Sequence, residues 1–129
     1  GEIDMKLYNI LYKVSAILKQ KGLYYDLKSH IGDDCYIKKM TERDRCMGKT
    51  HTLMKLSAKY KIPVLEPNIA LKYDFQKEYE KAIVISPNDL RGKKYDVVLI
   101  DEMQLLTTNV IEVLDSMKIK QIGIMTKYR

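Results

Sequence analysis

Two short segments, far apart in the chain, carry residue types that bind phosphate and metal ions. The triplet Gly48-Lys49-Thr50 places an ammonium group and a hydroxyl directly after a glycine. The pair Asp101-Glu102 places two carboxylates after an apolar run. An ammonium group attracts phosphate oxygens, and a hydroxyl together with a carboxylate suits Mg²⁺. If the chain brings the two segments together, they predict a site for a phosphate ester and its metal.

The triplet needs a strand before it and a helix after it, because backbone N–H groups at a helix N-terminus cradle phosphates. The segment Cys35–Thr41 is predicted to be the strand. The segment after Thr50 is predicted to be a helix that stops before Ile62-Pro63, since its apolar residues fall on one face. A side chain at position 48 would collide with the phosphates. The expected nucleotide-binding residues are Cys46, Met47, Gly48, Lys49, Thr50 and His51.

The carboxylate pair follows Val97–Ile100, a continuous apolar run typical of a strand that is buried on both faces of a parallel sheet. Ligands of open α/β sheets lie at the carboxyl ends of the strands, where this pair is expected. Asp101, with Thr50, would hold Mg²⁺, and Glu102 would act as a general base on an attacking water. The alternative is that the pair simply begins a solvated loop.

Helical and strand patterns alternate along the chain. Helices are predicted at Met5–Lys21, ended by Gly22, and at Asn68–Glu80 and Asn109–Lys118; further strands are predicted at Ile62–Glu66, Lys81–Ser86, Tyr95–Asp101 and Lys120–Lys127. This order predicts an α/β fold, a three-layer parallel sheet with flanking helices. We expect residues 1–34 to form an N-terminal helix and connector, with 1–4 a tag remnant, packed as one domain with a core at 35–129. The N-terminal helix either covers one face of the sheet or docks a partner.

The amino-acid composition indicates which kinds of partner the protein can bind. The chain has 129 residues, a net charge of +6 that comes mostly from lysine, and no apolar run of membrane-spanning length. We therefore expect no membrane partner and a cytoplasmic location. Two cysteines and two histidines suggest neither a zinc site nor a disulfide framework. The lysine excess is compatible with a solvated surface and with a nucleic-acid partner.

Over residues 35–127 these motifs resemble those of P-loop NTPases, in the division that has a catalytic glutamate. RDRCMGKT (43–50) is similar to a Walker A loop and VVLIDE (97–102) to a Walker B strand. The resemblance implies a small P-loop fold that uses Mg²⁺ and ATP. DEMQ is similar to a helicase box, which implies that Gln104 senses the γ-phosphate. Thr126 looks like the polar sensor on the neighbouring strand, although both residues could instead be ordinary surface polar groups.

The loop departs from the family pattern at Arg43, where the first glycine normally stands. Phage large terminases, which pump DNA into capsids, have similar loops with an arginine that is thought to face the γ-phosphate. The resemblance implies that Arg43 or Arg45 stabilises charge on the transferred phosphoryl group. An ion pair with Glu42 or Asp44, or simple solvation, is the alternative.

The expected function is Mg²⁺-dependent ATP hydrolysis by a small, phage-encoded ATPase of the host cytoplasm that handles nucleic acid. Glu102, Lys49, Arg43 and Arg45 are its predicted catalytic residues. One alternative is a degenerate P-loop interaction module with little activity alone, completed by an arginine from a second copy or a protein partner. Another is a nucleotide kinase, although such enzymes need arginine-bearing lids and this chain has few arginines.

Overall fold

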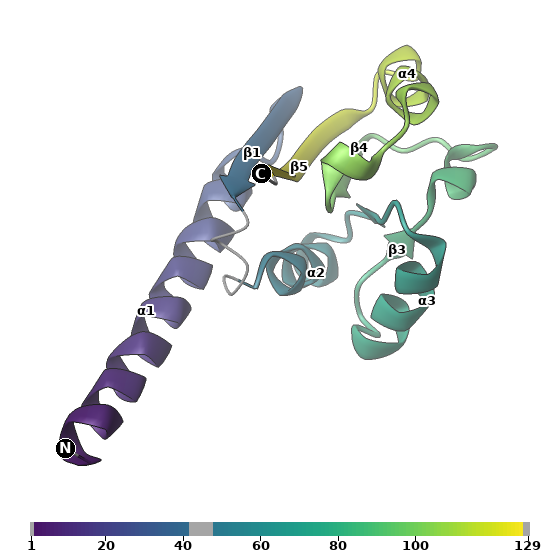
Figure 1. The fold of residues 1–129 in the computed structure, drawn as a ribbon. Helices are drawn as coiled ribbons and strands as arrows, with labels where there is room; N and C mark the ends of the chain where they lie inside the picture. The colour runs from purple at the N-terminus through teal and green to yellow at the C-terminus, as the bar shows by residue number, and fades with distance from the viewer. Residues whose placement is uncertain (1, 42–47, 128–129) are drawn as a thin grey trace.

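The computed structural model describes residues 2–41 and 48–127. Within these ranges the strands form one five-stranded parallel sheet in the order β1-β5-β4-β2-β3. The helices are α1 (Glu2–Ser29), α2 (Lys49–Tyr60), α3 (Ile69–Glu78) and α4 (Thr108–Ser116), and the strands are β1 (Cys35–Thr41), β2 (Val64–Leu65), β3 (Val84–Ile85), β4 (Val97–Ile100) and β5 (Lys120–Lys127). Figure 1 shows the elements in place. The predicted α/β class with a parallel sheet and flanking helices is confirmed.

The side chains of each strand point alternately to the two faces of the sheet, and the hydrophobic core accordingly consists of two clusters. Val64 and Leu99 point to the face covered by α1 and α2, whereas Leu65 and Ile100, the next residues, point to the face covered by α4. Successive side chains of a strand point to opposite faces, so a strand buried on both sides must be apolar throughout. This explains the continuous apolar run in β4, whose last three residues are fully buried. Helices therefore cover both faces of the sheet.

The N-terminal helix is longer than predicted and packs differently. α1 runs through Gly22 to Ser29, because Leu23 and Leu27, four residues apart, are buried against the core and continue the helix. The apolar residues expected to cover the sheet are instead 47–62% exposed: Leu7, Ile10, Leu11, Val14, Ile17 and Leu18. In Figure 1 this part of α1 projects away from the sheet. The predictions that Gly22 ends the helix and that Met5–Lys21 covers the sheet are therefore wrong.

The other predicted elements occur at the expected places, but the strands β2, β3 and β4 are shorter than predicted. β1 and β5 have the predicted bounds, and Asn68 caps α3 by accepting hydrogen bonds from Ala70 and Leu71. β2 and β3 contain two residues each, and a short 3₁₀ helix, Pro87–Leu90, follows β3. The order of the sheet places β5, the last strand in the chain, between β1 and β4.

Candidate nucleotide and metal site

The predicted site residues meet at the carboxyl edge of the sheet. α2 begins close to this edge, and β4 ends there just before Asp101. β5 lies between β1 and β4, and its Thr126 is hydrogen-bonded both to Lys49, at the start of α2, and to Gln104, two residues after Glu102. Segments that are more than 50 residues apart in the chain are joined here by side-chain hydrogen bonds.

Gly48 precedes α2 in a left-handed conformation, with φ of 63° and ψ of 44°. This region is open to glycine and costly for other residues. No side chain of the described residues caps the N-terminus of α2, and its first turn contains no acidic residue. The first N–H groups of the helix, together with the positive end of its dipole, are therefore left for an anion.

Lys49 is only 9% exposed, although lysine is rarely buried. Its Nζ donates a hydrogen bond to Thr126 Oγ1 at 3.0 Å. An ammonium group has three donors, so two remain for phosphate oxygens. Thr126 itself is 2% exposed, which excludes the alternative that it is a surface polar residue.

The hydroxyl of Thr50 donates to Asp101 Oδ2 at 2.9 Å, so the two predicted metal ligands are in contact. Asp101 is 2% exposed, which excludes the alternative of a solvated loop position for this residue. Its burial raises the pKa of the carboxyl, the hydrogen bond from Thr50 opposes the rise, and the charge of Glu102 adds to it. Asp101 Oδ1 is buried and has no hydrogen-bond partner among the described residues.

Glu102 and Gln104 form a relay toward Thr126. The Gln104 amide donates to Glu102 Oε2, and its Oε1 accepts a hydrogen bond from the Thr126 backbone N–H at 2.9 Å. Glu102 has φ of 48°, a left-handed conformation that is uncommon outside glycine. Strained backbone of this kind clusters at functional sites. A movement of Thr126 can therefore shift the Glu102 carboxylate, because the Gln104 side chain is hydrogen-bonded to both residues.

Sequence reasoning missed one residue at this edge, Glu66. It follows β2, the neighbour of β4, and is 1% exposed. Asn68 N–H donates to its Oε1 at 3.1 Å, while its Oε2 has no hydrogen-bond partner within the described ranges. Burial raises the pKa of Glu66 to about 8; the N–H of Asn68 opposes the rise, and the charges of Asp101 and Glu102 add to it. Its position at the end of an apolar predicted strand, like that of Asp101, is the sequence signal that could have identified Glu66 as a site residue.

The donor set at this edge fits a hard divalent cation. Mg²⁺ prefers oxygen ligands and is usually held by one or two carboxylates together with waters and substrate phosphates, not by a complete protein cage. Asp101 contacts the Thr50 hydroxyl through Oδ2, and its other oxygen, Oδ1, is buried, as is Oε2 of Glu66. The described part of the chain contains no group of three or more His, Cys, Asp or Glu that could hold a metal ion by itself. These oxygens therefore suit a metal ion whose remaining ligands are waters and substrate phosphates.

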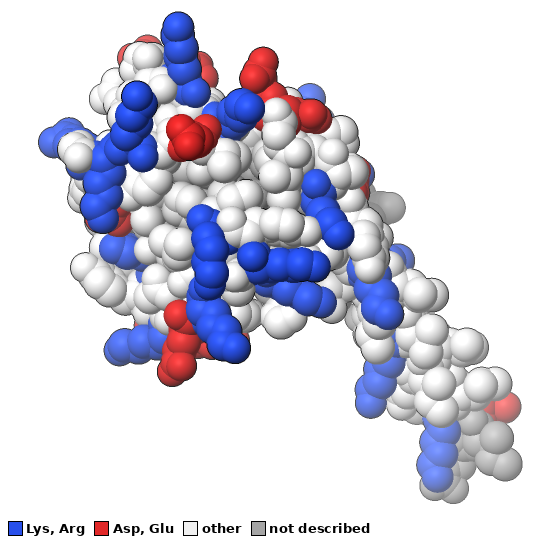
Figure 2. Space-filling view, turned by 180° about the vertical axis from the view of Figure 1, so that it is seen from behind, with Lys and Arg blue, Asp and Glu red and all other residues white. Residues whose placement is uncertain are grey.

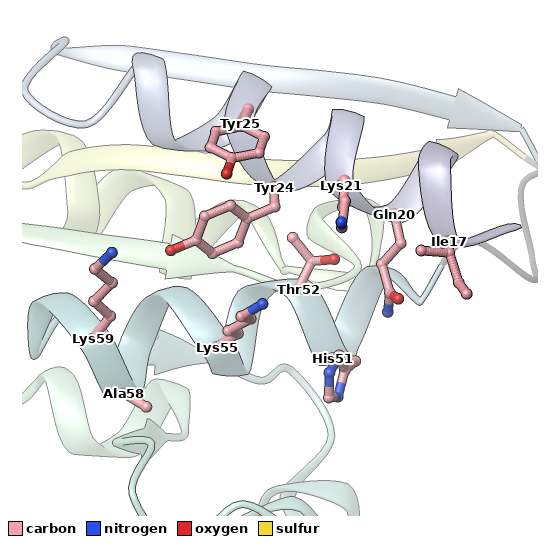
Figure 3. Close-up of a pocket in the computed structure, with 10 residues that line it drawn as sticks. All are labelled: Ile17, Gln20, Lys21, Tyr24, Tyr25, His51, Thr52, Lys55, Ala58 and Lys59. Atoms are coloured by element: carbon pink, nitrogen blue, oxygen red, sulfur yellow. The ribbon is translucent and has the colours of Figure 1, made fainter. Parts of the chain in front are cut away.

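A second feature lies on the other side of the first turn of α2. A cavity of about 520 Å³ separates α1 from α2 (Figure 3). Its described lining includes no acidic residue and combines three lysines with aromatic rings: Lys21, Lys55, Lys59, Tyr24, Tyr25 and His51. Lys55 Nζ lies 5.1 Å from the centre of the Tyr24 ring. His51, predicted to bind nucleotide, is exposed, lines this cavity and lies with its ring centre 5.7 Å from that of Tyr79.

Four predicted site residues lie outside the described residues: Arg43, Arg45, Cys46 and Met47. Among the described residues, the structure therefore brings together Lys49, Thr50, Asp101, Glu102, Gln104 and Thr126. Gly48 and His51 flank that group: Gly48 directly precedes α2, and His51, in the first turn of α2, lines the cavity toward α1.

Comparison of the chain with protein-family models gave no match, and comparison with curated proteins gave none either. None of the helices within the described ranges has the length and apolar character required to cross a bilayer.

Proposed function

We propose that this protein binds Mg²⁺ and ATP at the carboxyl edge of its sheet and hydrolyses the γ-phosphate. The convergence of Lys49, Thr50 and Asp101 supports this function, because it combines a phosphate-binding ammonium group with a hydroxyl and a carboxylate for the metal. The P-loop type of fold, with a catalytic glutamate, is part of the same proposal. The free N–H groups at the start of α2 add a place for the phosphate oxygens.

Each described residue has a separate task in the reaction. Lys49 binds the β- and γ-phosphate oxygens, and Thr50 with Asp101 would hold Mg²⁺, which neutralises charge on those oxygens when bound. Glu102 accepts a proton from the attacking water as the water oxygen bonds to the γ-phosphorus. The bond between that phosphorus and the bridging oxygen breaks, giving ADP and inorganic phosphate. Gln104 orients Glu102 and reports the state of Thr126.

We also propose a catalytic role for the two arginines that precede Gly48 in the sequence. Arg43 or Arg45 would stabilise charge on the transferred phosphoryl group, and an arginine from a second copy or a protein partner would serve the same purpose. An activity that appears only on assembly would identify the second source.

A hydrolysis assay tests the proposal. Phosphate release from ATP should require Mg²⁺ and should fall by about 100-fold or more in Glu102→Gln, which removes the general base and keeps the shape of the side chain. ATP binding should persist in that variant. Turnover that survives both Glu102→Gln and Lys49→Ala would refute the assignment. Phosphorylation of an added nucleoside would instead identify a kinase, and binding without turnover would identify an interaction module.

The nucleic-acid role in this proposal is supported by the cavity between α1 and α2. Lysines bind a phosphate backbone and aromatic rings stack on bases, which is the usual combination for single strands. Lys side chains also line the projecting part of α1, where they outnumber acidic groups in Figure 2. Single-stranded DNA should therefore stimulate hydrolysis, and Lys55→Gln with Lys59→Gln should reduce that stimulation. Lys118→Gln, on an exposed turn beyond α4, is the matched control.

A further inference from the structure

Two buried carboxyl groups at the site each have one oxygen with a partner and one without. Thr50 donates to Asp101 Oδ2, and the N–H of Asn68 donates to Glu66 Oε1. Asp101 Oδ1 and Glu66 Oε2 have no partner within residues 2–41 and 48–127, although both side chains are at most 2% exposed. Buried polar atoms are nearly always hydrogen-bonded, so this neighbouring pair of carboxyl groups must either share a proton or hold a cation.

The backbone fixes the two groups side by side. Leu65 of β2 pairs with Ile100 of β4, and Glu66 and Asp101 are the residues that follow this pair. Asp101 N–H donates to Leu65 O at 3.2 Å, and Glu66 N–H donates to Ile85 O at 2.9 Å. The two carboxyl groups lie within hydrogen-bonding reach of each other if one carries a proton. Their juxtaposition therefore follows from the sheet register, not from a flexible loop.

The ligand that suits this pair is a cation. Two adjacent buried carboxylates repel each other and are costly unless they are paired. The ion pairs formed among the described residues involve neither Glu66 nor Asp101. Lys49, a buried lysine, donates its hydrogen bond to Thr126, although its charge also lowers the pKa of Asp101. Carboxylate oxygens select hard divalent ions such as Mg²⁺ and Mn²⁺ over soft metals.

We infer that Glu66 and Asp101 form a two-carboxylate site that takes up a divalent cation before nucleotide binds, with Glu66 as a metal-site residue in addition to Thr50 and Asp101. This inference builds on the proposed function, because the same cation would serve the nucleotide. It adds an order of events: metal first, nucleotide second. Water molecules complete the coordination until phosphate oxygens replace some of them.

Mn²⁺ is a suitable probe because its electron paramagnetic resonance signal distinguishes free from bound ion. The nucleotide-free protein, first stripped with a chelator, should bind one Mn²⁺ in a titration. Glu66→Gln, which has nearly the same shape and no charge, should weaken that binding about 10-fold or more, the usual loss on removing a supporting metal-site group. Asp101→Asn should weaken it as well. Glu112→Gln, an exposed residue on α4, should match the unmodified protein.

Unchanged Mn²⁺ affinity in Glu66→Gln, or no Mn²⁺ uptake without nucleotide, would overturn the inference. If Glu66→Gln does not fold, Glu66→Asp replaces it, since a retracted carboxylate should also lose affinity. ATP is absent from the titration, so its outcome is separate from that of the proposed function. A protein that binds Mn²⁺ through Glu66 but never binds ATP would support the inference and refute the ATPase assignment.

Discussion

The ammonium group of Lys49 donates a hydrogen bond to the hydroxyl of Thr126 at 3.0 Å, across 77 residues of sequence. The contact joins the first residue of α2 to the carboxyl end of β5, and Gln104 joins that same threonine to Glu102. Lys49 and Glu102, the proposed phosphate-binding and water-activating residues, are therefore connected through Thr126 and Gln104. This connection leads to predictions that can be tested one residue at a time.

Gln104→Ala should lower turnover and leave ATP binding intact. The variant removes the amide that holds Glu102 and accepts from the Thr126 N–H. A general base that moves by about 1 Å can lose roughly 100-fold in rate. Single-turnover hydrolysis and equilibrium ATP binding, measured on the same preparation, separate the two effects. Equal losses in binding and turnover would show that Gln104 supports the site as a whole and is not a positioning residue.

Gly48→Ala should weaken ATP binding as well as destabilise the fold. An alanine with φ near 63° costs roughly 1–2 kcal/mol, and its Cβ would overlap the Gln20 side chain. Gly92→Ala is a matched control, because Gly92 has φ of 77° and open space around it. Both variants should unfold at lower urea concentration, but only Gly48→Ala should lose affinity for ATP. Loss of affinity in both would mean that the effect comes from general destabilisation.

Gly22→Ala should stabilise the protein by roughly 0.5–1 kcal/mol, since Gly22 lies inside α1 and alanine is the better helix former. A Cβ at this position would meet no atom within 4 Å. Urea unfolding followed by circular dichroism measures the change. If α1 ended at Gly22 in a left-handed turn, the same substitution would destabilise the protein.

The stability of metal-free protein should fall as pH rises from about 5 to 8, in part because of Glu66. Burial raises the pKa of Glu66 from 4.5 to about 8, so in this window the folded state keeps a proton that the unfolded chain releases. The contribution is complete below pH 4.5 and is lost as pH rises through 8, with a slope of at most about 1.4 kcal/mol per pH unit. Urea unfolding in EDTA should show a flatter decline for Glu66→Gln. A difference between the two proteins that stays constant over this range would exclude the raised pKa.

Local signals explain which elements the sequence predicts correctly. β5 begins and ends as predicted because its apolar run is bounded by lysines, and Asn68 caps α3 because capping depends on neighbouring residues. The sequence also placed Thr50 and Asp101 in one site, because one was expected at the start of a helix and the other at the end of a strand; the contact of Lys49 with Thr126 was not predicted. Residue type and spacing suffice for such features.

Features that depend on tertiary packing were not predicted. A glycine commonly ends a helix by adopting a positive φ, but Gly22 does not, and α1 continues because Leu23 and Leu27 are buried beyond it. Glu66 was placed at a strand end, but its contact with Asp101 depends on β2 and β4 being neighbours. Chain order does not specify that neighbour, since β3 lies between the two in sequence and outside them in the sheet.

Isothermal titration calorimetry of Mg²⁺–ATP into the protein and into Lys49→Met is the most direct test of the site. Methionine keeps much of the buried volume and removes the ammonium group, so the fold should survive the change. We expect saturable binding at one site, weakened by roughly 100-fold in the variant, or about 2.7 kcal/mol. Equal affinity in both proteins, or no binding to the unmodified protein, would contradict the proposed nucleotide site.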